Sequence, residues 1–157
     1  SLLQPLSSRI PELIEAIAMA DIESQAVLLR REAVDLPPVA GIIGREDDFY
    51  SVLSRDPVPD ASYRAFTFHF RPGRLDEAGK MARITQVLGV ETSDIEESLS
   101  CLNRLPALRL GHAERIAKLD QVLAGESLAL TGNWFSGVSI EDSLIRSAGE
   151  FSRLFST

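Results

Sequence analysis

The sequence predicts an α+β fold, a strand-rich region followed by a short α/β segment. Phenylalanines alternate with polar residues over 66–70, which is typical of a half-buried strand. Apolar residues recur at helical spacing over 75–89 and 111–125, and Gly89 is expected to end the first of these helices. The last 50 or so residues have the order helix, strand, turn, helix found in α/β nucleotide-binding domains.

Composition limits the functional classes. The 157 residues are 45% hydrophobic and 25% charged, as in globular proteins that bury a core. A net charge of −7 disfavours binding to nucleic acid. No apolar run approaches the roughly 20 residues of a membrane span, and the first residues do not resemble a secretion signal. Cys101 is the single cysteine, which fits a cytoplasmic location, and we expect its side chain to be buried.

The elements follow from periodicity and turn residues. A helix is expected from Ile10 to Ile17, and a mixed β-sheet is expected to be interspersed with the helices. Turn residues separate the runs that we expect to be strands. These runs are 22–34, 39–44, 49–56, 62–70, 95–105 and 127–132.

The stretch LALTGNWFSGVSIEDSLIRSA predicts a buried strand, a glycine turn and a helix. Gly132 and Gly137 permit tight backbone geometry and the close approach of another group. Ser139 and Asp142 have the spacing of a capping box. The helix start would present free N–H groups and its positive dipole end, which together can bind an anion or a polarised carbonyl. The apolar residues of the final helix are expected to form its buried face: Ile140, Leu144, Ile145, Ala148, Phe151 and Phe155.

Two blocks resemble the family of protoporphyrinogen oxidases and flavin-containing amine oxidases. GNWFSGVSIEDSLIRSA is similar to that family's C-terminal flavin-contact segment, of the form G-N-x-x-x-G-V-x-x-x-D-C. Upstream, the run from Leu102 to Gly125 is similar to its P-Q-Y-x-x-G-H-x-E-R region. Ser143 stands where the family often has cysteine, and Ala107 and Leu108 replace Gln and Tyr. The chain would therefore be the C-terminal portion of a larger FAD-dependent oxidoreductase.

The resemblance implies a domain division and a cofactor. Residues 1–105 would belong to the substrate-binding domain, and 106–157 would be the closing helix–strand–helix segment of a Rossmann-like FAD domain. The cofactor-contacting residues would be Gly132, Asn133, Trp134, Gly137, Val138 and Ser139. The helix start would stabilise the negative charge that develops on the flavin as a small, hydrophobic substrate loses a hydride to it. No G-x-G-x-x-G motif is present, and Gly41–Gly44 has the wrong spacing, so the chain alone is not expected to hold FAD.

Other side chains leave alternatives open. His112 could contact cofactor or substrate, or make a local hydrogen bond in the first turn of its helix. His69 would lie opposite the phenylalanines, facing solvent or the substrate. Trp134 and Phe135 could pack on a flavin or fill a domain junction. No residue can be assigned as catalytic, and the histidines and cysteine do not have the spacing of a metal site.

Two further expectations concern partners. A homodimer is possible, because a cut end would expose apolar surface. The alternative to a flavoenzyme is a non-enzymatic α+β module that binds a planar hydrophobic ligand or a partner protein.

Overall fold

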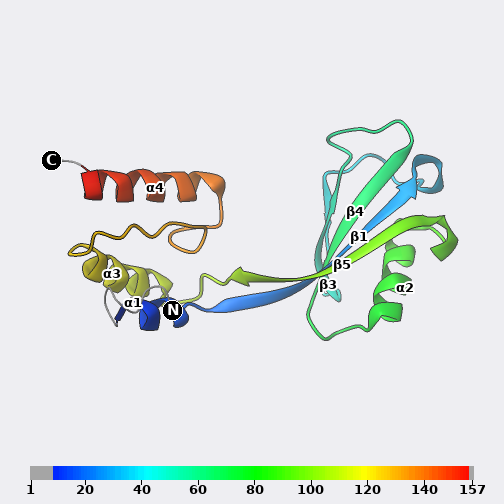
Figure 1. Ribbon diagram of the computed structural model, residues 1–157. Helices are drawn as coiled ribbons and strands as arrows, with labels where there is room; N and C mark the ends of the chain where they lie inside the picture. The colour runs from blue at the N-terminus through cyan, green and yellow to red at the C-terminus, as the bar shows by residue number, and fades with distance from the viewer. Residues whose placement is uncertain (1–8, 156–157) are drawn as a thin grey trace. The chain divides into compact units, whose positions relative to one another are not determined.

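The computed structural model describes residues 9–155, which divide into two compact units. The sheet unit comprises residues 21–104, and the helical unit comprises residues 9–20 together with 105–155. The chain passes between the two units within the first and the last strand (Figure 1). The division falls next to the predicted boundary at 105/106 and also assigns the N-terminal helix to the C-terminal unit.

The sheet unit is built on a five-stranded sheet in the order β2-β3-β4-β1-β5. Its strands are β1 (Met19–Arg30), β2 (Gly41–Ile43), β3 (Phe49–Ser54), β4 (Tyr63–Phe70) and β5 (Ile95–Pro106). The pairs β2–β3, β3–β4 and β1–β4 are antiparallel, and β5 runs back alongside β1 (Figure 1). The α+β class is confirmed, with an antiparallel sheet rather than a mixed one, because short loops join β2, β3 and β4.

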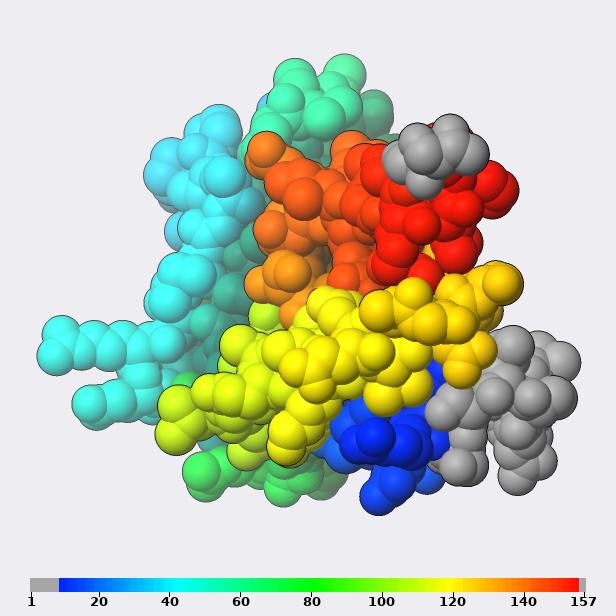
Figure 2. Space-filling model, turned by 90° about the vertical axis from the view of Figure 1, so that its left-hand side faces the viewer, coloured from blue at the N-terminus to red at the C-terminus, as the bar shows by residue number. Residues whose placement is uncertain are grey.

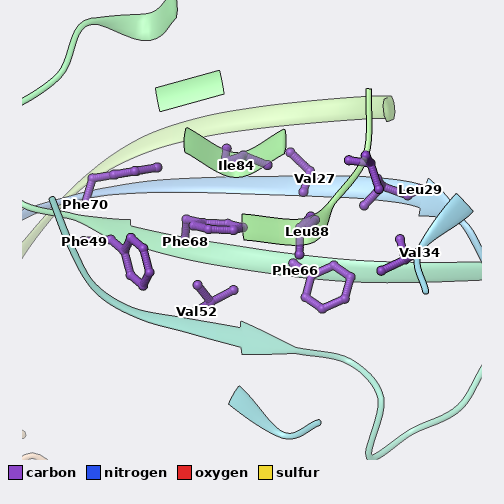
Figure 3. Packing of buried hydrophobic residues seen from close by; sticks show 11 residues of the cluster. Val27, Leu29, Val34, Phe49, Val52, Phe66, Phe68, Phe70, Ile84 and Leu88 are labelled. Carbon is purple, nitrogen blue, oxygen red and sulfur yellow. The ribbon is translucent and has the colours of Figure 1, made fainter. Parts of the chain in front are cut away.

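Helix α2 (Glu77–Leu88) packs on one face of this sheet and closes the first core. Asp76 caps its start, and Gly89 ends it in the left-handed conformation with φ 69°. Alternate β4 residues Phe66, Phe68 and Phe70 face the core, as their spacing predicted. Figure 3 shows these rings in one cluster with Ile84 and Leu88 of α2. Two 3-10 turns, η1 (Arg31–Ala33) and η2 (Thr92–Asp94), complete the unit.

Arg64 precedes these three phenylalanines on the core-facing side of β4, although it is charged. Its guanidinium donates to both carboxylate oxygens of Asp56, at 3.0 and 2.7 Å, and to the carbonyl oxygens of Val34, Leu36 and Pro37. Both side chains are almost fully buried. A buried arginine is tolerated because its donors are satisfied, and this one ties the loop after β1 to the sheet.

The helical unit contains α1 (Arg9–Glu15), α3 (His112–Leu123) and α4 (Ile140–Phe155). Its core joins α1 to α3 and to one aromatic residue of the 132–139 turn. The fully or nearly buried members are Ile10, Ile17, Ile116, Leu119, Leu123 and Phe135. In Figure 2, α4 (orange to red) lies along the surface of this unit.

Three further expectations are wrong. Residues 127–132 do not form a strand, because the described chain provides no neighbouring strand to complete a ladder. The apolar face of α4 is exposed, with Ile140 at 82% and Phe155 at 67%, whereas Glu150 is buried. Cys101 is exposed rather than buried, because β5 lies at the edge of the sheet.

Candidate cofactor-binding turn

The segment 132–139 is a compact turn whose two glycines are required by their surroundings. Gly132 has φ 144°, and a Cβ added there would lie 2.8 Å from the indole Nε1 of Trp134. A Cβ at Gly137 would overlap the carboxylate of Asp142. A clash with Trp134 of the turn and one with Asp142 of α4 therefore explain the two glycines.

Phe135 anchors this turn in the helical unit. Its side chain is 2% exposed, and its carbonyl oxygen lies 3.0 Å from Nε2 of His112, the first residue of α3. A carbonyl oxygen only accepts, so Nε2 donates this hydrogen bond, and the buried Nδ1 has no partner among the described residues. The side chain of His112 therefore makes a hydrogen bond across 23 residues rather than the local bond in the first turn of its helix.

Polar side chains of α4 also contact the turn. The guanidinium of Arg146 lies 3.9 Å from the centre of the Phe135 ring, and it pairs with Asp120 of α3 and with Glu150. Trp134 stacks on the same ring, with centroids 4.0 Å apart. The conformation of the turn is therefore set by contacts with both helices.

Glu150 is the buried acceptor of this cluster. It pairs with Arg146 and Arg153 and accepts from the backbone N–H of Leu130 at 3.2 Å. Burial raises the pKa of Glu150, but the hydrogen bonds from Arg153 and Leu130 and the charge of Arg146 outweigh it, so its pKa lies below the ordinary value. Arg146 and Arg153 in turn donate to the carbonyls of Leu130 and Leu128. Helix side chains thus satisfy backbone groups that a sheet would otherwise pair.

The beginning of α4 is open to solvent. Val138 is 64% and Ile140 82% exposed. Ser139 Oγ accepts from the backbone N–H of Asp142 at 3.0 Å, which confirms the prediction that the Ser139 side chain caps α4. Within the described residues, no hydrogen bond is found from the N–H groups of Gly137 or Val138. These donors at a helix start can bind an electron-rich group.

A hollow lies between this turn and the start of α3. Its volume is about 670 Å³, within the range of about 300–1,000 Å³ that is typical of small-molecule pockets. Phe135 and Ser136 line one side, and Gly111 and His112 line the other. The exposed Leu110 adds apolar surface at its rim. A flat ring system could therefore approach the turn from this side.

The structure places the predicted cofactor residues Gly132, Asn133, Trp134, Gly137, Val138 and Ser139 in this turn and joins His112 to it. His69 belongs to the sheet unit, on the face opposite the phenylalanines, and is half-buried. Its Nδ1 lies 3.0 Å from Ser24 Oγ, which also accepts from Asn103 at 2.8 Å. No cluster of potential metal ligands is found among residues 9–155.

Sequence reasoning missed the polar cluster of α4. Arg146, Glu150 and Arg153 are spaced i, i+4 and i+7, which places them on one helical face. That spacing was a usable signal, but charged residues on a helix usually face water, and the apolar stripe opposite them appeared to be the buried face.

Comparison with solved structures shows similarity to reduced UDP-galactopyranose mutase. The match has a TM-score of 0.61 at 10% sequence identity and covers 92% of this chain. The chain corresponds to 36% of that structure's length. At this identity the similarity concerns the fold. No family model matches the sequence, and no match was found among curated proteins. Within the described residues, no helix is long and apolar enough to cross a membrane.

Proposed function

We propose that this chain is part of an FAD-dependent oxidoreductase of the protoporphyrinogen oxidase and flavin amine oxidase type. In this proposal the enzyme dehydrogenates a small hydrophobic substrate by hydride transfer to the flavin. The observation that carries the proposal is the anchored turn from Gly132 to Ser139, which is open to solvent at Val138 and Ser139. The N–H groups of Gly137 and Val138, just before α4, have no partner among the described residues. The fold supports it, because the chain is similar to the structure of reduced UDP-galactopyranose mutase, an enzyme whose structure is described in a reduced state.

The residues present fit one part of a flavin and not the other. The half-buried Gly137, the exposed Val138 and the neighbouring hollow suit the edge of an isoalloxazine ring. The chain has no G-x-G-x-x-G turn that could bind the pyrophosphate. We therefore expect the isolated chain to be colourless after purification, with the ADP-binding part supplied by additional sequence.

When bound, a flavin would accept the hydride from substrate. The roles of this chain's own residues would be electrostatic and positional. The N–H groups of Gly137 and Val138, at the positive end of α4, would stabilise negative charge on the reduced ring. His112 and Arg146 would hold the turn so that these donors need not reorganise. His69, on the open side of the sheet, would be available for a substrate contact.

Two unpaired features support a larger protein. Residues 128–131, Leu-Ala-Leu-Thr, are mostly apolar, and no strand pairs with them in the described chain. The exposed apolar face of α4 contains Leu144, Ile145 and Phe151, each about two-thirds exposed. A missing β-sheet would cover both features, because α/β domains bury the apolar face of a helix against parallel strands.

A titration with lumiflavin, the isoalloxazine ring without ribityl phosphate or ADP, tests the proposal. Trp134 is the single tryptophan, so its fluorescence reports on the turn. We expect saturable quenching that Val138→Ala preserves and Val138→Pro weakens about tenfold, because proline removes one N–H donor. The absence of saturable quenching in the wild type, or equal affinity of both variants, contradicts the assignment of the site.

A second candidate is the non-enzymatic binding module. The exposed apolar face of α4 favours it, because an apolar helix face on the surface commonly marks a partner interface. Spectroscopy of a longer chain that includes the preceding reading frame separates the two candidates. A bound flavin spectrum supports the oxidoreductase, whereas a longer chain without flavin supports the module.

A further inference from the structure

Among residues 9–155, no strand pairs with the outer edge of β5. This strand is the outermost one beside β1, and it is 12 residues long. Most of its residues are exposed, including Leu99 at 73% and Leu102 at 66%. Long, exposed edge strands with apolar side chains are templates for pairing with another strand, and proteins usually block them with proline, lysine or a bulge. Residues 96–104 of β5 contain neither proline nor lysine.

The sequence of β5 is complementary to itself in one antiparallel register. Centred on Ser100, this register places Glu96 opposite Arg104 of the second copy, and the symmetry repeats the pair. It also places Leu99 opposite Cys101 of the second copy. Opposite charges and apolar pairs directly across an antiparallel ladder each stabilise it.

The charged groups are available for such pairing. Arg104 approaches Asp21 only to 3.8 Å, beyond hydrogen-bond distance, and its side chain is 74% exposed. Glu96 bonds the guanidinium of Arg30 at 2.8 Å through Oε1 and remains 42% exposed. A carboxylate can accept from a second arginine through its other oxygen.

We propose that β5 is a dimerisation edge, on which a second copy of this chain adds its own β5 antiparallel, with Ser100 on the two-fold axis. The continuous sheet would then contain ten strands, five from each copy. This contact is isologous, so it closes on itself and does not extend into a fibre. The proposal is independent of the flavin site, which lies in the helical unit.

Sedimentation equilibrium tests the charge complementarity. The wild type should associate reversibly to a dimer at high micromolar concentration. Glu96→Arg or Arg104→Glu alone should weaken the dimer about tenfold, because each places like charges across both symmetric positions. The double charge swap should restore association. A monomeric wild type, or a double variant no better than the single ones, overturns the proposal.

Cysteine cross-linking tests the register. In a Cys101→Ser background, Ser100→Cys places two thiols across the ladder, with Cβ atoms about 4.5–5.5 Å apart. The matched control, Leu102→Cys, leaves its thiols about 13–14 Å apart, because each lies four residues from its counterpart along the strand. With a copper–phenanthroline oxidant, Ser100→Cys should form a disulfide-linked dimer several times faster than Leu102→Cys. Equal rates overturn the proposed register and the proposal with it.

Discussion

Nε2 of His112 lies 3.0 Å from the carbonyl oxygen of Phe135, and this hydrogen bond joins the start of α3 to the turn before α4. The two residues are 23 positions apart, and both are buried. The backbone of the proposed flavin turn is therefore tied to a neighbouring helix. Its conformation should depend on this bond even when no ligand is present.

Replacing His112 with alanine should destabilise the helical unit by about 1–3 kcal/mol, because the buried carbonyl of Phe135 loses its donor. Lys118→Ala, on the exposed side of the same helix, is the matched control and should change stability by less than about 0.5 kcal/mol. Urea denaturation followed by Trp134 fluorescence measures both. Equal effects of the two substitutions would show that the bond contributes nothing to stability.

The two glycines at 125 and 137 should respond differently to alanine. In Gly137→Ala the new Cβ would overlap the carboxylate of Asp142, so this side chain must move and loses the hydrogen bond that it accepts from Ser139 Oγ. We expect a loss of about 1 kcal/mol, the usual net contribution of one hydrogen bond. Gly125→Ala has no atom within 4 Å of the new Cβ and should be neutral. Thermal unfolding compares the two, and equal transition temperatures would contradict the expected clash.

Arg64→Met should destabilise the sheet unit by about 3–5 kcal/mol, because it leaves Asp56 buried without its partner. The control is Arg55→Met, which replaces the exposed arginine next to Asp56 in the sequence and should have little effect. Chemical denaturation followed by far-UV circular dichroism gives the difference. If Arg64→Met is as stable as the control, the pair at Asp56 is replaceable by apolar packing.

Stability should fall in acid, and Asp56 should contribute to the fall. The hydrogen bond from Arg64 is the largest cause that lowers the pKa of Asp56 in the folded state. A carboxyl whose folded pKa is lowered stabilises the fold above its unfolded pKa, and this contribution is lost as pH falls through the lowered pKa. Asp56→Asn should therefore flatten the dependence of unfolding free energy on pH below about pH 4. An unchanged slope would exclude Asp56 as a contributor.

Phe68→Ala tests the sheet core. Its ring is fully buried and contacts two other rings, those of Phe49 and Phe70, with centroids 5.7 Å away in each case. The cavity should cost about 3–5 kcal/mol. Leu53→Ala, on the exposed face of the adjacent β3, should cost less than about 1 kcal/mol. Urea denaturation of both variants checks the assignment of faces.

Local pattern alone predicted much of the fold. The alternation of Phe66, Phe68 and Phe70 placed β4 and its buried face, and Gly89 marked the end of α2. These predictions succeeded because such signals depend on residues close in sequence. The side chain of Ser139 likewise caps α4, as its position before Asp142 indicated.

Long-range contacts decided the rest. The sequence identified α4 as amphipathic, but periodicity does not state which face meets the rest of the protein. In this chain Arg146 and Glu150 face inward, because they satisfy Asp120 and the backbone of Leu130, and the apolar face remains exposed. In the same way, residues 128–131 have the composition of a strand, but a strand forms only where a neighbouring strand supplies its hydrogen bonds.

The sequence by itself determined the helices, most of the strands and the glycine turn, since each depends on the preferences of nearby residues. Only the tertiary structure decided that His112 holds Phe135, that α4 turns its charges inward and that β5 lies at an open edge. The physical reason is that these features depend on which groups, distant along the chain, meet to satisfy one another's hydrogen bonds and charges.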